Sequence, residues 1–347
     1  MQNGREQFKP VRNVRYPDGV TVFLFAIVAN LAAQLIVGVA AECGAVVTGN
    51  ANFAKNDYFQ LIAMLSLQLA FVAVPLVYYG VVKKATPCLR FGWKKPRPAL
   101  SLAFLLPVLC IIGFMLPAFY FVTGLERIGY TLSEGVQLNT AGKWVLGVIA
   151  IVVIAPCVEE IIFRGFLLNG LIEHHSPVKA ALLSALAFSL MHMNPEQTVY
   201  QFCLGFVCAL ATMASGNLLG GVIVHMFSNL LALLIDTPFG KPYNEAFAFL
   251  TKTPWGAVLT TVLAAAACGV AIWFVCAAIR KYSRPRQTPS HAVDLPDEKG
   301  EEPMSEENAQ KAAAQKIAEK KTGRIMYIAG IGLCTVLWVF VFAAGMM

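Results

Sequence analysis

Ionisable and amide side chains stand inside three strongly apolar stretches of this sequence. A charged side chain inside a membrane-spanning helix costs about 2.5–3.5 kcal/mol on insertion scales, so such residues are rare and are functional candidates. The stretches therefore predict a reaction site between helices. In chain order the residues are Glu159, Glu160 and Arg164, then Phe188 and His192, then His225 and Asn229.

Helical spacing gives the two glutamates different surroundings. Glu160 and Arg164 are four residues apart, so they share a helix face and can form an ion pair. Glu159 is rotated by about 100° from Glu160, which lets its carboxylate face a cavity while Arg164 neutralises Glu160. An unpaired carboxylate that is removed from water is a better proton acceptor. Glu159 is therefore the expected general base, and Glu160 and Arg164 are expected to support the site.

One glutamate, two histidines and one asparagine from three helices suit the hydrolysis of an amide. Glu159 and His192 could hold and deprotonate a water molecule. His225 and Asn229, which are four residues apart, could donate hydrogen bonds to the oxyanion that develops on the carbonyl. These four are the expected catalytic residues. Phe188 precedes His192 by four residues, so its ring is expected to pack beside the imidazole and support the site.

A second mechanism would use the same atoms. Glu159, His192 and His225 form a three-ligand set that could hold a zinc ion and its water. The sequence contains no HExxH motif, and asparagine is a poor zinc ligand, so the metal-free mechanism is favoured. The expected cofactor is none, with zinc as the alternative.

Some polar residues in membrane spans only link helices, for about 0.6–2 kcal/mol per contact. Glu160 with Arg164 could be such a structural pair, and Asn229 alone would fit the same interpretation. Six such residues in three neighbouring helices favour a reaction site. The remaining histidines lie in predicted cytoplasmic loops and are expected to be solvated: His174, His175 and His291.

The composition indicates that these helices lie in a membrane. Of the 347 residues, 57% are hydrophobic and 14% are charged, whereas soluble domains average about 45–50% and roughly 25%. This excludes a disordered chain, a nucleic-acid-binding domain and a typical cytosolic enzyme. The nine cysteines form no CxxC pair, so they support neither a disulfide framework nor a zinc ribbon.

Long apolar runs divide the chain, and a span needs roughly 20 such residues. We expect an all-α, polytopic transmembrane helical bundle of about nine spans with an intramembrane catalytic cavity. The middle runs are short and are separated by only a few polar residues. The runs are 20–41, 58–82, 98–125, 144–168, 178–193, 197–215, 218–235, 254–279 and 325–347.

The basic residues predict the orientation of the bundle. They cluster before residue 16, at 83–97 and after residue 279, whereas the loops at 42–57 and 126–143 carry few. Cytoplasmic loops are enriched in Lys and Arg, so this alternation predicts a cytoplasmic N-terminus and an external C-terminus. The net charge of +7 reflects these loops and does not indicate nucleic-acid binding. Counted from the cytoplasmic side, His192 falls late in its helix and Glu159 early. The fifth run is therefore expected to be tilted or re-entrant, or the loop at 169–177 to lie deep.

The three motifs in this order resemble those of the CaaX protease and bacteriocin-processing (CPBP) family of intramembrane proteases, which includes the type II CaaX prenyl endopeptidase. The similarity covers roughly residues 140–240. It implies a membrane-embedded helical bundle whose cavity opens toward the cytosol. It also implies peptide-bond cleavage in which Glu159 and His192 activate water and His225 and Asn229 stabilise the oxyanion. Bacterial members are linked to bacteriocin immunity, peptide maturation and regulated proteolysis.

With this resemblance the chain divides into four parts. We expect a cytoplasmic tail at 1–19 and a membrane-embedded protease domain at 20–279, with its motif core at about 140–240. A polar cytoplasmic linker follows at 280–324, with a short helix that begins near 305 and ends at Gly323. The last part is an extra C-terminal span at 325–347.

The predicted function is that of an intramembrane endopeptidase that acts near the C-terminus of a membrane-associated peptide or protein. Its expected partners are the lipid bilayer and this substrate, with no nucleic acid, and its expected location is the bacterial cytoplasmic membrane. A proton-coupled transporter is the alternative from another class, since buried Glu and His chains also relay protons. Transporters commonly contain inverted repeats, and no second segment resembles 144–235. A scaffold that binds a partner without cleaving it is a third possibility.

Overall fold

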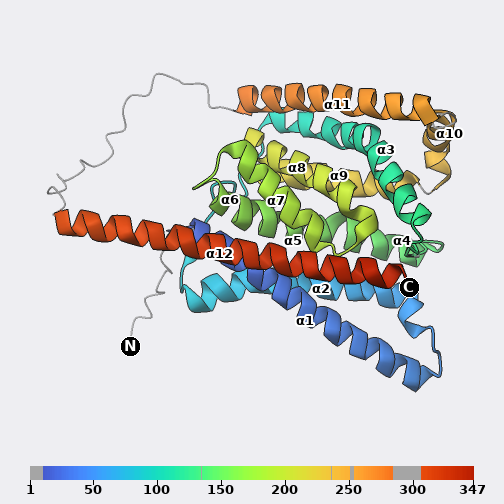
Figure 1. Cartoon of the computed structure of the whole chain (residues 1–347), viewed down its shortest axis with the longest axis horizontal. Helices are drawn as coiled ribbons and strands as arrows, with labels where there is room; N and C mark the ends of the chain where they lie inside the picture. Colours follow the sequence, from blue (N-terminus) through green and yellow to red (C-terminus); the bar gives the residue numbers. More distant parts are fainter. Residues whose placement is uncertain (1–10, 134, 236, 251–253, 284–305) are drawn as a thin grey trace, which may run out of the picture.

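The chain folds into a bundle of long helices (Figure 1). The structure is a computed structural model that describes residues 11–133, 135–235, 237–250, 254–283 and 306–347. The only strands within these ranges are β1 (Val11–Asn13) and β2 (Thr86–Cys88), which pair in parallel. The predicted all-α, polytopic transmembrane class is confirmed.

Apolar helix-forming runs, bounded by polar caps, make up most of the chain. Asn56, Thr140 and Ser176 each accept a hydrogen bond from the backbone N–H three residues further on, which caps the helix that follows. The α-helices are α1 (Tyr16–Thr48), α2 (Asp57–Val77), α3 (Leu105–Arg127), α4 (Ala141–Gly147), α5 (Ala155–Glu160), α6 (Leu168–Leu171), α7 (Pro177–Met191), α8 (Thr198–Ser215), α9 (Leu219–Ile235), α10 (Lys241–Leu250), α11 (Pro254–Ser283) and α12 (Glu306–Gly345). Short 3-10 helices are η1 (Phe53–Lys55), η3 (Pro98–Phe104), η6 (Pro195–Gln197) and η7 (Pro238–Gly240), and π-helical segments are η2 (Tyr78–Val82), η4 (Val148–Ile154) and η5 (Ile161–Leu167).

In the described part of the chain, seven helical stretches are long and apolar enough to cross a membrane. An eighth crossing results if α9 and the segment Pro238–Phe249, which meet at 93°, count as one span. The prediction was about nine spans. The predicted run that does not form such a stretch is α7, whose 15 residues reach only about 22 Å, against a hydrocarbon core of about 30 Å. The seven are Tyr16–Thr48, Asp57–Val82, Pro98–Arg127, Ala141–Leu171, Pro195–Ser215, Ala257–Ser283 and Ala313–Gly345.

The central helices α5 to α9 lie between two groups of outer helices (Figure 1). On one side α3 packs against α11, and both contact α8. On the other side α1 packs against α2 and α12, and its core residues continue into η5, α6 and α7. Exposed leucine, isoleucine and valine side chains cover the outer faces of α1, α2, α11 and α12. The molecule is therefore a multi-pass membrane protein whose polar cluster lies in its innermost layer.

Helix α12 is one unbroken helix of 40 residues, not a short polar helix followed by a separate span. The predicted end at Gly323 is wrong because this glycine allows a close helix contact. A Cβ atom at Gly323 would lie 2.5 Å from the ring of Tyr16, and one at Gly330 would lie 2.7 Å from the ring of Phe23. Small residues permit such close approach between membrane helices, and they bring α12 against α1.

Two side-chain hydrogen bonds also fix α12 to the central helices. The hydroxyl of Tyr327 donates to the carbonyl of Leu183 in α7 at 2.8 Å, and Nε1 of Trp338 donates to Thr198 Oγ1 in α8 at 2.7 Å. The C-terminal span is therefore part of the bundle.

The basic segments lie together at one end of the bundle. The pairing of β1 with β2 joins the N-terminal segment to the loop before α3. Lys83 Nζ lies 2.8 Å from Asp18 Oδ1, and Arg15 pairs with Glu319. At the opposite end, the N–H of Thr131 donates to the carbonyl of Gly345 at 2.7 Å. The predicted topology requires the basic segments to lie at one end of the bundle. The compartment that this end faces stays a prediction.

The histidines at 174 and 175 are only partly solvated, contrary to the prediction. Their rings pack edge-on against Tyr16, with centroid distances of 5.1 and 6.1 Å. This burial lowers the pKa of His175. His291, the start of the tail at 1–10 and the linker residues 284–305 lie outside the described residues.

Candidate active site

The two glutamates stand on a helical stretch, Ala141–Leu171, which contains two π-helical segments. The π-helical segments η4 and η5 flank the short helix α5 that carries both carboxylates. The N–H of Ala155 donates to the carbonyl of Ala150, and that of Leu168 to Phe163, in each case five residues back. Single π-helical turns inside α-helices are frequent at functional sites. Here they set the rotation of α5 relative to the rest of the span.

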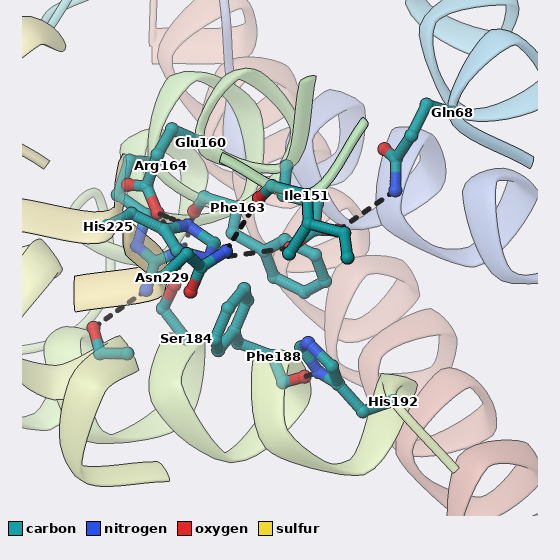
Figure 2. A network of polar contacts seen from close by, with 12 residues as sticks. Gln68, Ile151, Glu160, Phe163, Arg164, Ser184, Phe188, His192, His225 and Asn229 are labelled. Carbon is teal, nitrogen blue, oxygen red and sulfur yellow. Dashed lines mark hydrogen bonds and ion pairs between the residues drawn. The ribbon is translucent and has the colours of Figure 1, made fainter. Parts of the chain in front are cut away.

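Glu160, Arg164 and His225 form a buried cluster of ionisable groups (Figure 2). Arg164 Nη1 lies 2.7 Å from Glu160 Oε1, and Nδ1 of His225 lies 3.1 Å from the same oxygen. Because an ionised carboxylate only accepts, Nδ1 of His225 is the donor. Arg164 Nη2 donates to the carbonyl of Gly205 at 2.8 Å. The predicted ion pair is present, and His225 joins it.

Glu159 contacts different partners, as its rotation from Glu160 predicts. Its Oε1 accepts a hydrogen bond from Gln68 Nε2 of α2 at 3.0 Å, and its Oε2 lies 3.9 Å from Nε2 of His225. Its overall exposure is 7%, whereas Glu160 is fully buried. The two neighbouring carboxylates therefore contact opposite nitrogens of one imidazole.

The ring of Phe188 packs against both catalytic histidine candidates (Figure 2). Its centroid lies 4.8 Å from that of His192 and 5.3 Å from that of His225, in edge-to-face geometry. The guanidinium carbon of Arg164 lies 4.6 Å from the same ring. The predicted packing beside His192 is found, and the ring also fixes the position of His225.

His192 stands directly after the last residue of α7 and is partly exposed. Its Nδ1 lies 2.8 Å from the carbonyl of Phe188. Because a carbonyl only accepts, Nδ1 carries the hydrogen, and the lone pair of the neutral imidazole is on Nε2. A proton acceptor on Nε2 is the property that the predicted role requires.

The short helix α7 explains how His192 and Glu159 reach similar depth. His192 lies about 22 Å along α7 from Pro177, and Glu159 lies about 18 Å along its span from Leu171. The fifth run ends at His192 and turns through η6 into α8. It does not cross the bundle as a span, and residues 169–171 belong to α6 instead of a loop.

Asn229 links α9 to the π-helical segment η4. Its Nδ2 donates to the carbonyl of Ile151 at 2.9 Å. In the π-helical pattern this carbonyl would accept from residue 156, but Pro156 has no N–H. The proline therefore leaves a backbone acceptor that Asn229 binds. This bond uses one of the two N–H groups of the amide.

Three residues near this cluster were not predicted from the sequence: Gln68, Gly205 and Gly221. A Cβ atom at Gly205 would lie 2.9 Å from the ring of Phe188, and one at Gly221 would overlap Glu160 Oε2. Gly221, His225 and Asn229 follow at intervals of four and mark one face of α9, which is the signal that could have found the glycine. Gln68 is an amide side chain in a leucine-rich part of α2. Such a residue indicates a polar site less strongly than the four-residue spacing on α9 does.

The alternative zinc-ligand set is not grouped as a metal site in this structure. Nδ1 of His225 contacts Glu160 and Nδ1 of His192 contacts a backbone carbonyl, as in histidines that bind zinc through Nε2, so these contacts do not exclude the set. Across the described ranges, no three His, Cys, Asp or Glu side chains group closely enough to hold a metal ion.

The fold and the cluster define a polytopic membrane protein with carboxylates, histidines and an asparagine buried between its central helices. Residues 141–231 match the family model described as type II CAAX prenyl endopeptidase Rce1-like. This match confirms the resemblance predicted from the three motifs, and the matched segment contains all seven predicted site residues. No curated protein and no solved structure matches the chain. The chain is thus a membrane protein with an Rce1-like segment, whose match supports an intramembrane endopeptidase of the CAAX-protease type.

Proposed function

We propose that the protein is an intramembrane endopeptidase that hydrolyses a peptide bond in a membrane-associated peptide or protein. The observation that supports the proposal is the series of contacts that links Glu159 and Glu160 to His225, and His225 through Phe188 to His192. Asn229 lies four residues after His225 on the same helix. The reaction class rests on the family match at residues 141–231.

Glu159 and His192 are the proposed activators of water. Gln68 holds one oxygen of Glu159 and leaves Oε2 directed at the interior of the site. His192 offers the lone pair of Nε2 and is partly open to its surroundings. A water oxygen attacks the peptide carbonyl carbon as Glu159 takes its proton. The same proton then passes to the leaving nitrogen when the C–N bond breaks.

His225 and Asn229 are the proposed donors to the oxyanion. Glu160 accepts the hydrogen of His225 Nδ1 and so orients the ring, and Nε2 lies 3.9 Å from Glu159 Oε2. As an oxyanion donor His225 would act from Nε2 in the imidazolium form. Asn229 contributes the amide N–H that Ile151 does not use. Loss of one oxyanion donor costs about 10²–10³ in kcat in other hydrolases, so each residue is expected to matter at that scale.

The substrate is proposed to reach the site from the membrane and the basic end of the bundle. We place that end in the cytoplasm because Lys and Arg are enriched in cytoplasmic loops, and we place the protein in a bacterial cytoplasmic membrane. In a bacterial membrane, a prenyl group is not the expected modification of the substrate.

The proposal is tested by terminal peptidomics of membranes that contain equal amounts of wild type, Glu159→Gln or Glu42→Gln. Glu42 is an exposed glutamate of α1 and serves as the matched control. We expect new peptide termini with wild type and with Glu42→Gln, and none with Glu159→Gln. Equal termini from all three folded proteins would refute the assignment of Glu159.

A further inference from the structure

A basic cavity lies at the end of the bundle, apart from the catalytic cluster. Its volume is about 900 Å³, and its walls are the start of η3, the turn between α8 and α9, and the end of α11. Three candidate spans begin or end there, so the cavity lies at the boundary of the membrane. None of the described residues that line it is acidic, and four are basic: Lys94, Lys95, Arg97 and Arg280.

The loop that supplies three of these cations is held in place by hydrogen bonds. Asn217 donates from Nδ2 to the carbonyl of Lys94 at 2.8 Å and accepts from its N–H at 3.4 Å. Arg97 Nη1 donates to the carbonyl of Ser283, the last residue of α11, at 2.5 Å. The basic groups are therefore positioned on a fixed frame between η3, α9 and α11.

An outward-facing groove continues from this cavity. Its volume is about 390 Å³, and it shares the segment from Pro96 to Pro98 and Leu100 with the cavity. Beyond them it is lined by Ser101, Phe104 and Ile223, and Phe104 is 45% exposed. The ring of Phe104 packs edge-on against Phe227, with 4.8 Å between centroids. The groove thus runs along α9 on the face opposite to His225.

We propose that the cavity and the groove together bind one anionic phospholipid. The phosphate lies among the four cations, and an acyl chain occupies the groove. Charge complementarity selects an anion for the cavity, because its described lining residues supply four basic side chains and no carboxylate. The adjoining apolar wall selects a lipid over inorganic phosphate, which would contact only the cavity.

The test uses the full chain in nanodiscs of a zwitterionic lipid. Retained phosphatidylglycerol is counted by native mass spectrometry as its fraction is increased, and inorganic phosphate is titrated in a parallel thermal-shift experiment. The key variant is Lys94→Gln/Lys95→Gln/Arg280→Gln, and its matched control is Lys316→Gln/Lys320→Gln/Lys321→Gln, which removes three exposed charges from α12. A second variant, Ser101→Trp, fills the groove and keeps all charges.

We expect wild type and the α12 control to retain one phosphatidylglycerol, and the cavity variant to bind it at least about tenfold more weakly. Ser101→Trp should weaken lipid retention in the same way. Retention that is equal in the cavity variant and in wild type would overturn the site. Inorganic phosphate could also produce a thermal shift that Ser101→Trp leaves unchanged. If phosphatidylglycerol is then not selectively retained, this result would overturn the lipid as the ligand of the cavity. Both readouts are independent of proteolysis.

Discussion

Glu160 and His225 are 65 residues apart in the sequence and meet in the interior, with Oε1 and Nδ1 separated by 3.1 Å. The contact joins α5 to α9 and uses the same oxygen that pairs with Arg164. Because Glu159 stands on the other side of the imidazole, the Glu-Glu dipeptide positions and polarises one histidine from both of its nitrogens. This arrangement gives the second glutamate a role that a purely structural ion pair would not have.

Arg164→Ala should reduce the yield of folded protein. The side chains of Arg164 and Glu160 are fully buried, and removal of one partner of a buried pair costs about 3–5 kcal/mol. The amount of detergent-stable protein in size-exclusion chromatography and its thermal unfolding would measure the loss. Arg127→Ala, at the exposed end of α3, is the control and should behave as wild type. Wild-type stability of folded Arg164→Ala would contradict the buried pair.

Gly221→Ala should impair catalysis more than folding. The added methyl group would overlap Glu160 Oε2, so the carboxylate that contacts His225 must shift. Crowding of this kind costs about 1–3 kcal/mol in stability, and we expect at least about a tenfold fall in kcat. Gly269→Ala in α11 is the control, because a Cβ atom there would meet nothing within 4 Å. Equal rates of substrate cleavage by both variants would argue against a positioning role for Glu160.

The sequence predicted the composition of this site better than its geometry. The four-residue spacings were sufficient to predict the Glu160–Arg164 pair and the packing of Phe188 on His192, since both lie within one helix. The contact of Asn229 with Ile151 could not be predicted, because it depends on π-helical hydrogen bonding and on the missing N–H of Pro156. Contacts between distant helices depend on rotation and depth, which an apolar run does not encode.

The ends of helices also depend on packing that the sequence pattern does not show. Gly323 was expected to end a helix, because glycine weakens helices in isolation. In the bundle, its lack of a side chain makes room for Tyr16. The predicted run at 178–193 matches α7 closely, but it was counted as a span although the 15 residues of α7 are short for a membrane crossing.

Gly330→Leu should weaken the packing of α12 on α1. A Cβ atom at this position would lie 2.7 Å from the ring of Phe23, and overpacking costs about 1–3 kcal/mol. Thermal unfolding in detergent should therefore show a lower midpoint than for Gly332→Leu. Gly332 is the control on the same helix, since a Cβ atom there would meet nothing within 4 Å. The same midpoint for both variants would show that α12 does not pack closely on α1.

Asn229→Ala should lower kcat by about 10²–10³ if its second N–H binds the oxyanion, with little change in KM. The variant also loses the bond to Ile151, so a control must lose a similar bond elsewhere. Asn244→Ala serves this purpose, because Nδ2 of Asn244 donates to the carbonyl of Ile235 at 3.0 Å. An equal and small effect in both variants would leave Asn229 with a structural role only.

Chelators should leave cleavage unchanged. A metal mechanism would need donor atoms of Glu159, His192 and His225 at one point, and no three His, Cys, Asp or Glu side chains of the described residues group closely enough to hold a metal ion. The measurement is the rate of substrate cleavage by purified protein after treatment with 1,10-phenanthroline, compared with the inert 1,7 isomer. Equal rates support water activation by Glu159 and His192 alone. Loss of activity with the first isomer, with recovery on addition of zinc, would refute the metal-free mechanism and require the three side chains to rearrange around the ion.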